Sequence, residues 1–309
     1  MVAPKVSASY APHPRPSLVS VVLAVRNGMP EITEQLEALA AQELDVPWEL
    51  VVADNGSSDA TVAEVARFEG RVPRLVVVDA SARPGQQFAR RCGVTVAAGE
   101  LVACCDHDDV VAPGWLQALV DASSDFDAVG GALELTTLND AQLINARQDL
   151  REWEVRLPKF STAVPYPGGA NWAIWRRIYV EIDEPDRDLP PSVGGEDVET
   201  GCRLRRAGRS LGFAPRARVA YRLRASTRET FQQLRAYGRG ASVIAARYPD
   251  LVGVEPSLVR TSWLCLALAA RAAKARLEGD DLHWSRRDVA YELGRLEGSL
   301  RIRFWRWGR

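Results

Sequence analysis

The 309-residue sequence is poor in the side chains that build the common metal and disulfide sites. It has only three histidines, His13, His107 and His283, which nearly excludes a metal centre made of several histidines. Its five cysteines are odd in number and form no Cys-x-x-Cys pair. Neither a disulfide framework nor a zinc site is therefore indicated, and the pattern favours a reducing, cytoplasmic environment.

An excess of one charge and long apolar runs are also missing. Lys and Arg number 39 against 40 Asp and Glu, a net charge of −1. A nucleic-acid-binding protein usually has a strong basic excess, so we expect no nucleic-acid partner. The longest apolar stretch near the C-terminus, 263–270, is far shorter than the ~20 residues of a membrane-spanning helix. Residues 1–16 contain four prolines and no apolar core of a signal peptide, which predicts a flexible tail.

Short apolar runs alternate with amphipathic segments through the first half of the chain. Strands are predicted at 18–25, 49–53, 75–78, 101–105, 171–175, 211–214 and 218–223. Helices are predicted from residue 30 to 39, at 60–68, 85–98, 113–120, 139–155, 197–207 and beyond 228, with loops at 158–169 and 182–195. This alternation predicts an α/β fold with a mostly parallel sheet covered by helices on both faces.

Acidic residues follow the predicted strands at their carboxyl ends, where open α/β sheets bind ligands. Asp54 ends the second strand, and Asp106, Asp108 and Asp109 end the fourth. If the fourth strand stays extended, Asp106 and Asp108 point the same way and His107 points away. Two carboxylates on one face suit Mg²⁺ or Mn²⁺. The alternative is an acid-rich turn that only caps the following helix.

Four motifs together carry a family resemblance. VSVVLAVRNG, LVVADNGSSDAT, ARRCGVTVAAGELVACCDHDD and GGEDVETGCRLRRAG lie between residues 18 and 221. In this order and at about this spacing they resemble the family-2 glycosyltransferases, which have a GT-A fold. The resemblance implies an inverting enzyme that moves a sugar from a nucleotide-diphosphate sugar to an acceptor hydroxyl, with Mn²⁺ or Mg²⁺ as cofactor.

The resemblance also implies a nucleotide site. The residues that would hold the nucleotide are Ala24, Val25, Arg26, Asp54, Asn55, Arg90 and Asp106. Asp108, with Asp106, would bind the metal that bridges the diphosphate. The residues themselves leave other readings open, because Asp54 also fits a simple turn at a strand end and Arg90 also fits an exposed helix position.

The same resemblance assigns the general base to Asp197, with Glu196 beside it at a helix start. The alternative is a pair of first-turn acids favoured by the helix dipole. The sugar donor and the acceptor would approach Gly169, Asn171 and Trp172, although Trp172 fits a core position equally well.

Two positions depart from the family pattern. Many members have a histidine where this chain has Arg222, which either weakens metal dependence or substitutes a fixed cation for part of the metal's role. Nine arginines and no acid lie between 203 and 228, which predicts an anion-facing cluster or a solvated surface. The Q-x-x-R-W motif of chain-building synthases ends in Ala236 here, so a processive polymerase is not expected.

The sequence thus divides into a tail (1–16), a GT-A-like domain (17–226) and a helical region (227–309). The last nine residues, RIRFWRWGR, mix arginines with aromatics, which predicts contact with an anionic membrane surface or, equally, packing on the catalytic domain or in a homodimer. We expect a cytoplasmic, non-processive transferase, at the inner membrane face if the tail binds lipid. Its acceptor would be a small molecule, a glycan or a lipid-linked hydroxyl. The alternatives are a nucleotidyltransferase and a non-catalytic nucleotide- or sugar-binding protein.

Overall fold

The computed structural model describes residues 12–160, 164–185, 188–190, 192–252 and 283–307, with isolated positions between 262 and 274. An eight-stranded sheet forms its centre, in the order β3-β2-β1-β4-β9-β6-β10-β5. Its strands are β1 (Val19–Val25), β2 (Trp48–Asp54), β3 (Leu75–Asp79), β4 (Leu101–Asp106), β5 (Val110–Val111), β6 (Ala128–Glu134), β9 (Asn171–Trp175) and β10 (Leu211–Ala220). A separate pair, β7 (Lys159–Phe160) and β8 (Val164–Pro165), forms a two-stranded ribbon.

The sheet is mostly parallel, as predicted. β1 pairs in parallel with β2 and β4, and β6 pairs in parallel with β10. β9 runs antiparallel between β4 and β6 and joins the two parallel groups. All seven residues of β1 are buried, because both faces of the sheet are covered. The carboxyl ends of β1, β2 and β4 therefore meet at one edge.

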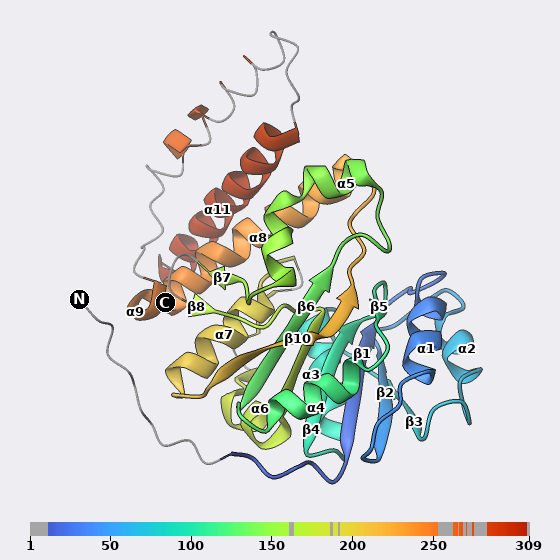
Figure 1. The fold of residues 1–309 in the computed structure, drawn as a ribbon. Helices are drawn as coiled ribbons and strands as arrows, with labels where there is room; N and C mark the ends of the chain where they lie inside the picture. The colour runs from blue at the N-terminus through green and yellow to red at the C-terminus, as the bar shows by residue number, and fades with distance from the viewer. Residues whose placement is uncertain are drawn as a thin grey trace.

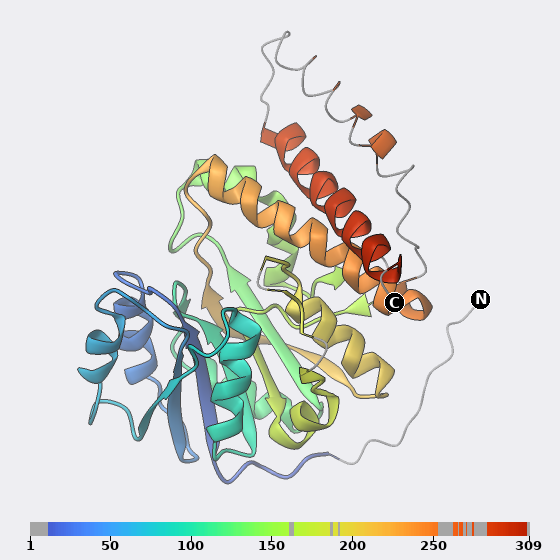
Figure 2. The ribbon, with the colours of Figure 1, turned by 180° about the vertical axis from the view of Figure 1, so that it is seen from behind.

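Helices cover both faces of the sheet (Figures 1 and 2). The helices before the C-terminal region are α1 (Ile32–Ala40), α2 (Thr61–Ala66), α3 (Gln86–Val96), α4 (Trp115–Ser123), α5 (Ala141–Ala146), α6 (Arg176–Ile182) and α7 (Glu196–Arg206). α3 packs on β1 and β2, whereas α4 packs on β9 and β10 from the opposite face. This three-layer arrangement confirms the predicted α/β class.

Several elements differ from the sequence prediction. β6 was not predicted, because its Gly130-Gly131 pair looks like a chain break. The structure shows the reason for Gly131, since a Cβ there would lie 2.4 Å from the side chain of Asn171. β10 is one strand with an irregularity between Ala214 and Arg218 rather than two strands. The expected loop at 158–169 contains β7 and β8, and the helix expected at 139–155 is divided into α5 and the 3-10 helix η1 (Gln148–Glu154).

The described residues of the C-terminal region are helical, as predicted. It comprises α8 (Thr227–Arg247), α9 (Pro249–Val252) and α11 (His283–Trp307). α8 and α11 lie side by side (Figure 2). They approach closely at glycines: a Cβ on Gly238 would meet the carbonyl of Tyr291 at 2.0 Å, and one on Gly294 would meet that of Arg235 at 2.0 Å. Among the described residues, no helix is both long and apolar enough to cross a membrane. The side chains of 303–309, which end the arginine-aromatic run, lie outside the described part.

Candidate active site

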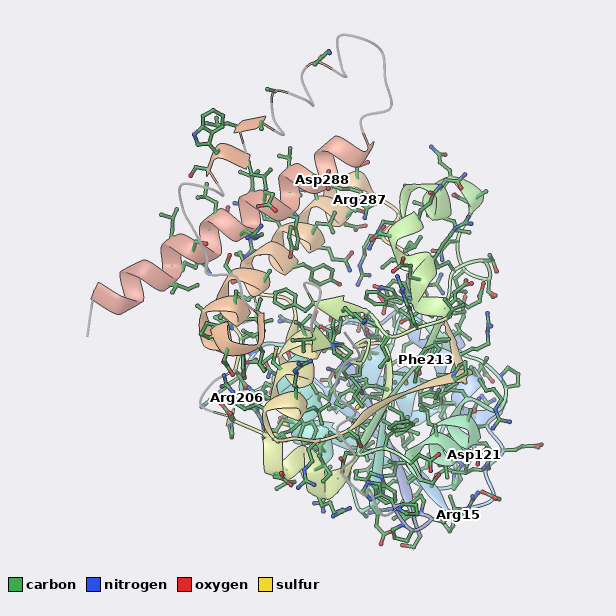
Figure 3. All side chains as sticks on the ribbon, turned by 60° about the vertical axis from the view of Figure 1, so that its left-hand side comes forward. Arg15, Asp121, Arg206, Phe213, Arg287 and Asp288 are labelled. Atoms are coloured by element: carbon green, nitrogen blue, oxygen red, sulfur yellow. The ribbon has the colours of Figure 1, made fainter. Side chains whose placement is uncertain are left out.

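A cavity of about 880 Å³ opens at the carboxyl edge of the sheet. Its lining comes from the ends of β4 and β10, the start of α3, the start of α7, and the helices α8 and α11. Figure 3 shows Arg287 and Asp288, two of the lining residues, at the start of α11 above the sheet. Six of the predicted site residues line this cavity: Asp106, Asp108, Gly169, Glu196, Asp197 and Arg222.

The acids after β4 form a compact cluster. One carboxylate oxygen from each of Asp106, Asp108 and Asp109 lies within 4.8 Å of the others. Burial raises the pKa of Asp106 to about 6 and, together with the neighbouring carboxylates, raises the pKa of Asp109 well above its ordinary range. These shifts show that the negative charges are poorly compensated by the protein. An all-oxygen cluster of this kind fits a divalent cation such as Mg²⁺ or Mn²⁺.

One cation at this cluster was not singled out in the sequence. Nη1 of Arg224 lies 2.8 Å from Oδ2 of Asp108. The guanidinium of Arg222 instead donates to the backbone carbonyl of Asp108 and to Glu34. The backbone N–H of Arg222 donates to Oδ1 of Asp109 at 2.8 Å. Arg224 is thus a fixed cation at Asp108, and Arg222 orders the turn that carries Asp108 and Asp109.

Asp197 lies at the start of α7 and lines the same cavity as Asp106 and Asp108. Gly195, at φ 102°, turns the chain into the helix. Oδ2 of Asp197 accepts a hydrogen bond from the backbone of Gly169 at 3.2 Å, and Oδ1 accepts one from Val198 at 2.8 Å. Burial and the charge of Glu196 raise the pKa of Asp197 to about 7. A carboxylate with this pKa can take up a proton near neutral pH, which suits a general base.

Helix α8 holds the loop that leads to Asp197. The N–H of Gly194 donates to the carbonyl of Ala236 at 3.1 Å. Arg239 donates to the carbonyl of Ser192 at 2.8 Å and to Glu297 of α11 at 3.0 Å. Gly240 lies so close that a Cβ there would meet the carbonyl of Gly194 at 1.7 Å. The position of the candidate base therefore depends on the C-terminal helices.

Arg90 lies behind the cavity rather than on its surface. It is 5% exposed, and its Nη2 donates to the carbonyl of Gly169 at 3.2 Å and lies 3.5 Å from Asp106. Its guanidinium also lies over the ring of Trp172, at 5.7 Å from the centroid. Arg90 thus links the acid cluster to the Gly169 backbone that contacts Asp197. The reading as an exposed helix arginine is excluded by this burial.

The structure corrects the expectation for Asn171 and Trp172. The amide of Asn171 donates to the carbonyls of Ala132 and Ala217, and its Oδ1 accepts from Trp115. This fully buried side chain has no group left for a sugar. Trp172 is 3% exposed and belongs to the hydrophobic core. Of the three predicted sugar-contacting residues, only Gly169 lines the cavity.

The predicted nucleotide residues at the ends of β1 and β2 lie at the same sheet edge as Asp106 but outside the cavity lining. Asp54 is partly buried and accepts from the backbone of Ser57 with both oxygens at 3.2 Å. Arg26 is exposed, whereas Ala24 and Val25 are buried in β1. The buried amide of Asn55 bonds to the backbone of Ala80, Arg83 and Gly85. Asn55 therefore shapes the loop before α3, of which Arg83 and Gly85 do line the cavity.

Some residues at the cavity were not predicted. Gln86 donates to Oδ1 of Asp106 at 2.5 Å, and Arg224 pairs with Asp108. The arginine-rich run between 203 and 228 was the only sequence signal for Arg224. Four tyrosines also line the cavity, at positions 166, 221, 237 and 291. No spacing relates them in the sequence, so only the fold could bring them together.

The sequence is similar to those of known proteins. The chain is 34% identical over 125 residues to the succinoglycan biosynthesis protein ExoO of Rhizobium meliloti, covering 40% of this chain and 34% of that protein. It is 27% identical over 252 residues to the pre-mycofactocin glycosyltransferase of Mycobacterium tuberculosis, covering 77% and 51%. The aligned region thus spans about a third to a half of the length of these relatives.

A solved structure shares the fold. The mannosyltransferase PcManGT from Pyrobaculum calidifontis, in complex with GDP-Man and Mn²⁺, matches with a TM-score of 0.66 and 20% identity, covering 96% of this chain and 91% of that one. The fold is accordingly the GT-A fold with C-terminal helices. The family model for glycosyl transferase family 2 matches residues 20–182. The motifs, the fold and this match agree, and the chain belongs to glycosyl transferase family 2.

Proposed function

We propose that this chain transfers a sugar from a nucleotide-diphosphate sugar to an acceptor hydroxyl, with inversion and without processivity. The observation that carries the proposal is a single cavity lined both by acids of the cluster and by Asp197, whose pKa is about 7. One displacement needs both features, because charge develops on the leaving diphosphate while the attacking hydroxyl loses its proton. The GDP-Man and Mn²⁺ in the Pyrobaculum neighbour support a nucleotide sugar and a divalent cation as ligands.

In this proposal each residue of the site has a separate role. Asp106 and Asp108, with Asp109 beside them, would hold the cation, which when bound would neutralise the charge of the departing diphosphate. Gln86 and Arg90 orient Asp106, and Arg224 orients Asp108. Asp197 accepts the proton of the acceptor hydroxyl, while the N–H groups of Gly169 and Val198 fix its carboxylate. Glu196 keeps the pKa of Asp197 high by repulsion. Asp54 and Arg26 remain proposed contacts of the nucleotide at the same sheet edge.

The experiment compares Asp197→Asn with Asp250→Asn, an exposed carboxylate of α9 that does not line the cavity. We expect Asp197→Asn to lower kcat by about 10²- to 10⁴-fold with donor affinity unchanged, and the wild-type kcat to rise with pH through about 7. Release of nucleoside diphosphate is measured from a panel of nucleotide sugars with Mn²⁺, and the anomeric configuration of the product is read by NMR. Full activity of Asp197→Asn, a retained anomeric configuration, or release of pyrophosphate would refute the proposal.

We propose in addition that the arginine-aromatic C-terminus brings the enzyme to the cytoplasmic membrane face. Its sequence pattern alone supports this, since its last side chains lie outside the described residues. Co-sedimentation with anionic vesicles at low salt tests it, and absence of binding by the intact chain would refute it.

A further inference from the structure

Four tyrosines from separate parts of the chain meet at the cavity. Tyr166 follows β8, Tyr221 follows β10, Tyr237 lies in α8 and Tyr291 lies in α11. All four line the cavity that contains Asp197. We call them the tyrosine chamber. Three of its members lie beyond residue 182, where the family match ends.

Tyr166 and Tyr237 lie near the candidate base, and Tyr221 lies near the acid cluster. The charge of Asp197 acts on both Tyr166 and Tyr237, and Tyr221 acts on the same two. Burial raises the pKa of all four phenols, so they keep their protons and can donate hydrogen bonds at neutral pH. Tyr237 is nevertheless 39% exposed, although its ring lies beside Gly194 in the loop before α7. Its ring therefore faces the cavity space.

No hydrogen bond links any of the four hydroxyls to another residue in the described part of the chain. The four tyrosines are half-buried or exposed, and none of their hydroxyls is a fully buried unpaired atom, so the hydroxyls are open to the cavity. Four hydroxyls open to one cavity can each donate to and accept from a ligand that offers many hydrogen-bonding groups. An apolar chain would cover these hydroxyls without pairing them.

The same chamber offers flat apolar surface. The ring of Trp153 stands at 90° to that of Tyr166, with 6.2 Å between centroids, and Leu234 and Ile244 complete the wall. A sugar ring has apolar faces and a rim of hydroxyls, and aromatic residues with polar tips match both. A site built to hydrogen-bond hydroxyls also rejects ligands that lack them.

From this geometry we infer that the tyrosine chamber is the acceptor site and that the acceptor is a saccharide whose attacking hydroxyl lies beside Asp197. The inference rests on the proposed sugar transfer and specifies its second substrate. The helix pair, which lies outside the matched family region, would thus select the acceptor.

Saturation-transfer NMR on the full chain tests the inference with two kinds of probe. The first is a panel of methyl hexosides and neutral disaccharides, and the second is farnesyl phosphate, an apolar chain with an anionic head. We expect saturation of sugar ring protons and none of the prenyl chain. Tyr237→Phe and Tyr291→Phe should each weaken sugar binding about 5- to 10-fold, the loss of one hydrogen bond. Tyr179→Phe, in α6 and outside the lining of this cavity, should not.

Hydrolysis of the donor is measured on the same proteins, so that the two proposals fail separately. Donor turnover without any sugar signal, or a signal from farnesyl phosphate alone, would overturn the saccharide assignment and leave the transfer reaction standing. Sugar signals that persist unchanged in both variants would overturn the role of the chamber. Sugar binding without donor turnover would instead refute the proposed function.

Discussion

The two walls of the cavity are built in different ways. The donor wall, formed by Asp106, Asp108 and Gln86, lies at the ends of parallel strands and is held by charged side chains and backbone bonds. The opposite wall is the tyrosine chamber, half of it carried by two helices that meet at glycines. The first wall lies within the family match, and most of the second lies outside it. The difference suggests that the chemistry is fixed by the sheet and the acceptor by the added helices.

Replacing one acid of the cluster should impair the reaction of the donor without affecting the tyrosine chamber. We expect Asp108→Asn to lower donor turnover about 10²- to 10³-fold and to abolish stimulation by Mn²⁺, because the cluster loses one oxygen ligand. Sugar binding in the tyrosine chamber should persist. Turnover is measured as nucleoside diphosphate release, with Asp250→Asn as the matched control. Equal loss of sugar binding would show that the two walls are not separable.

A methyl group added to α8 should displace the loop that leads to Asp197. In Gly240→Ala the new Cβ would lie 1.7 Å from the carbonyl of Gly194, so the loop before Asp197 must move. We expect kcat to fall about 10- to 100-fold, since a small misplacement of a catalytic group is costly, while donor affinity is unchanged. Gln232→Ala, on the exposed face of the same helix, is the control. Normal kcat in a folded Gly240→Ala protein would show that the base does not depend on α8.

The sequence predicts the donor side of the molecule better than the acceptor side. β2 and β4 are mainly apolar runs that end in Asp54 and Asp106, and parallel strands bring such ends to one edge. Asp54, Asp106 and Asp108 could therefore be expected at one edge, whereas only the family resemblance placed Asp197 with them. β10, however, ends at Ala220, and beyond it the alternation of side chains no longer tells whether Arg222 or Arg224 faces the acids.

Burial and tertiary packing explain the other residues whose roles the sequence analysis did not predict. Asn171 is polar and follows two glycines, which favours a ligand contact, yet the core needs its amide to pair two carbonyls across the sheet. The four tyrosines of the chamber carry no local pattern, because they meet only through tertiary packing, in which α8 contacts α7 and α11. Tertiary contacts of this kind have no signature in a single sequence.

The raised pKa of Asp197 should also make the free energy of unfolding depend on pH. The pKa of Asp197 is about 7 in the folded protein against about 3.9 in an unfolded chain. Between these values the folded state holds a proton that the unfolded state has released, so this group lowers the stability as pH rises from about 4 to about 7. Asn carries no charge and removes that loss. The advantage of Asp197→Asn over wild type in free energy of unfolding should therefore grow by roughly 2 kcal/mol between pH 5 and pH 8. Urea unfolding of both proteins at the two pH values measures it, and comparing the difference cancels any constant effect of the amide on its hydrogen bonds. An advantage that stays constant between pH 5 and pH 8 would mean that Asp197 is ionised in the folded protein throughout, and would contradict the raised pKa.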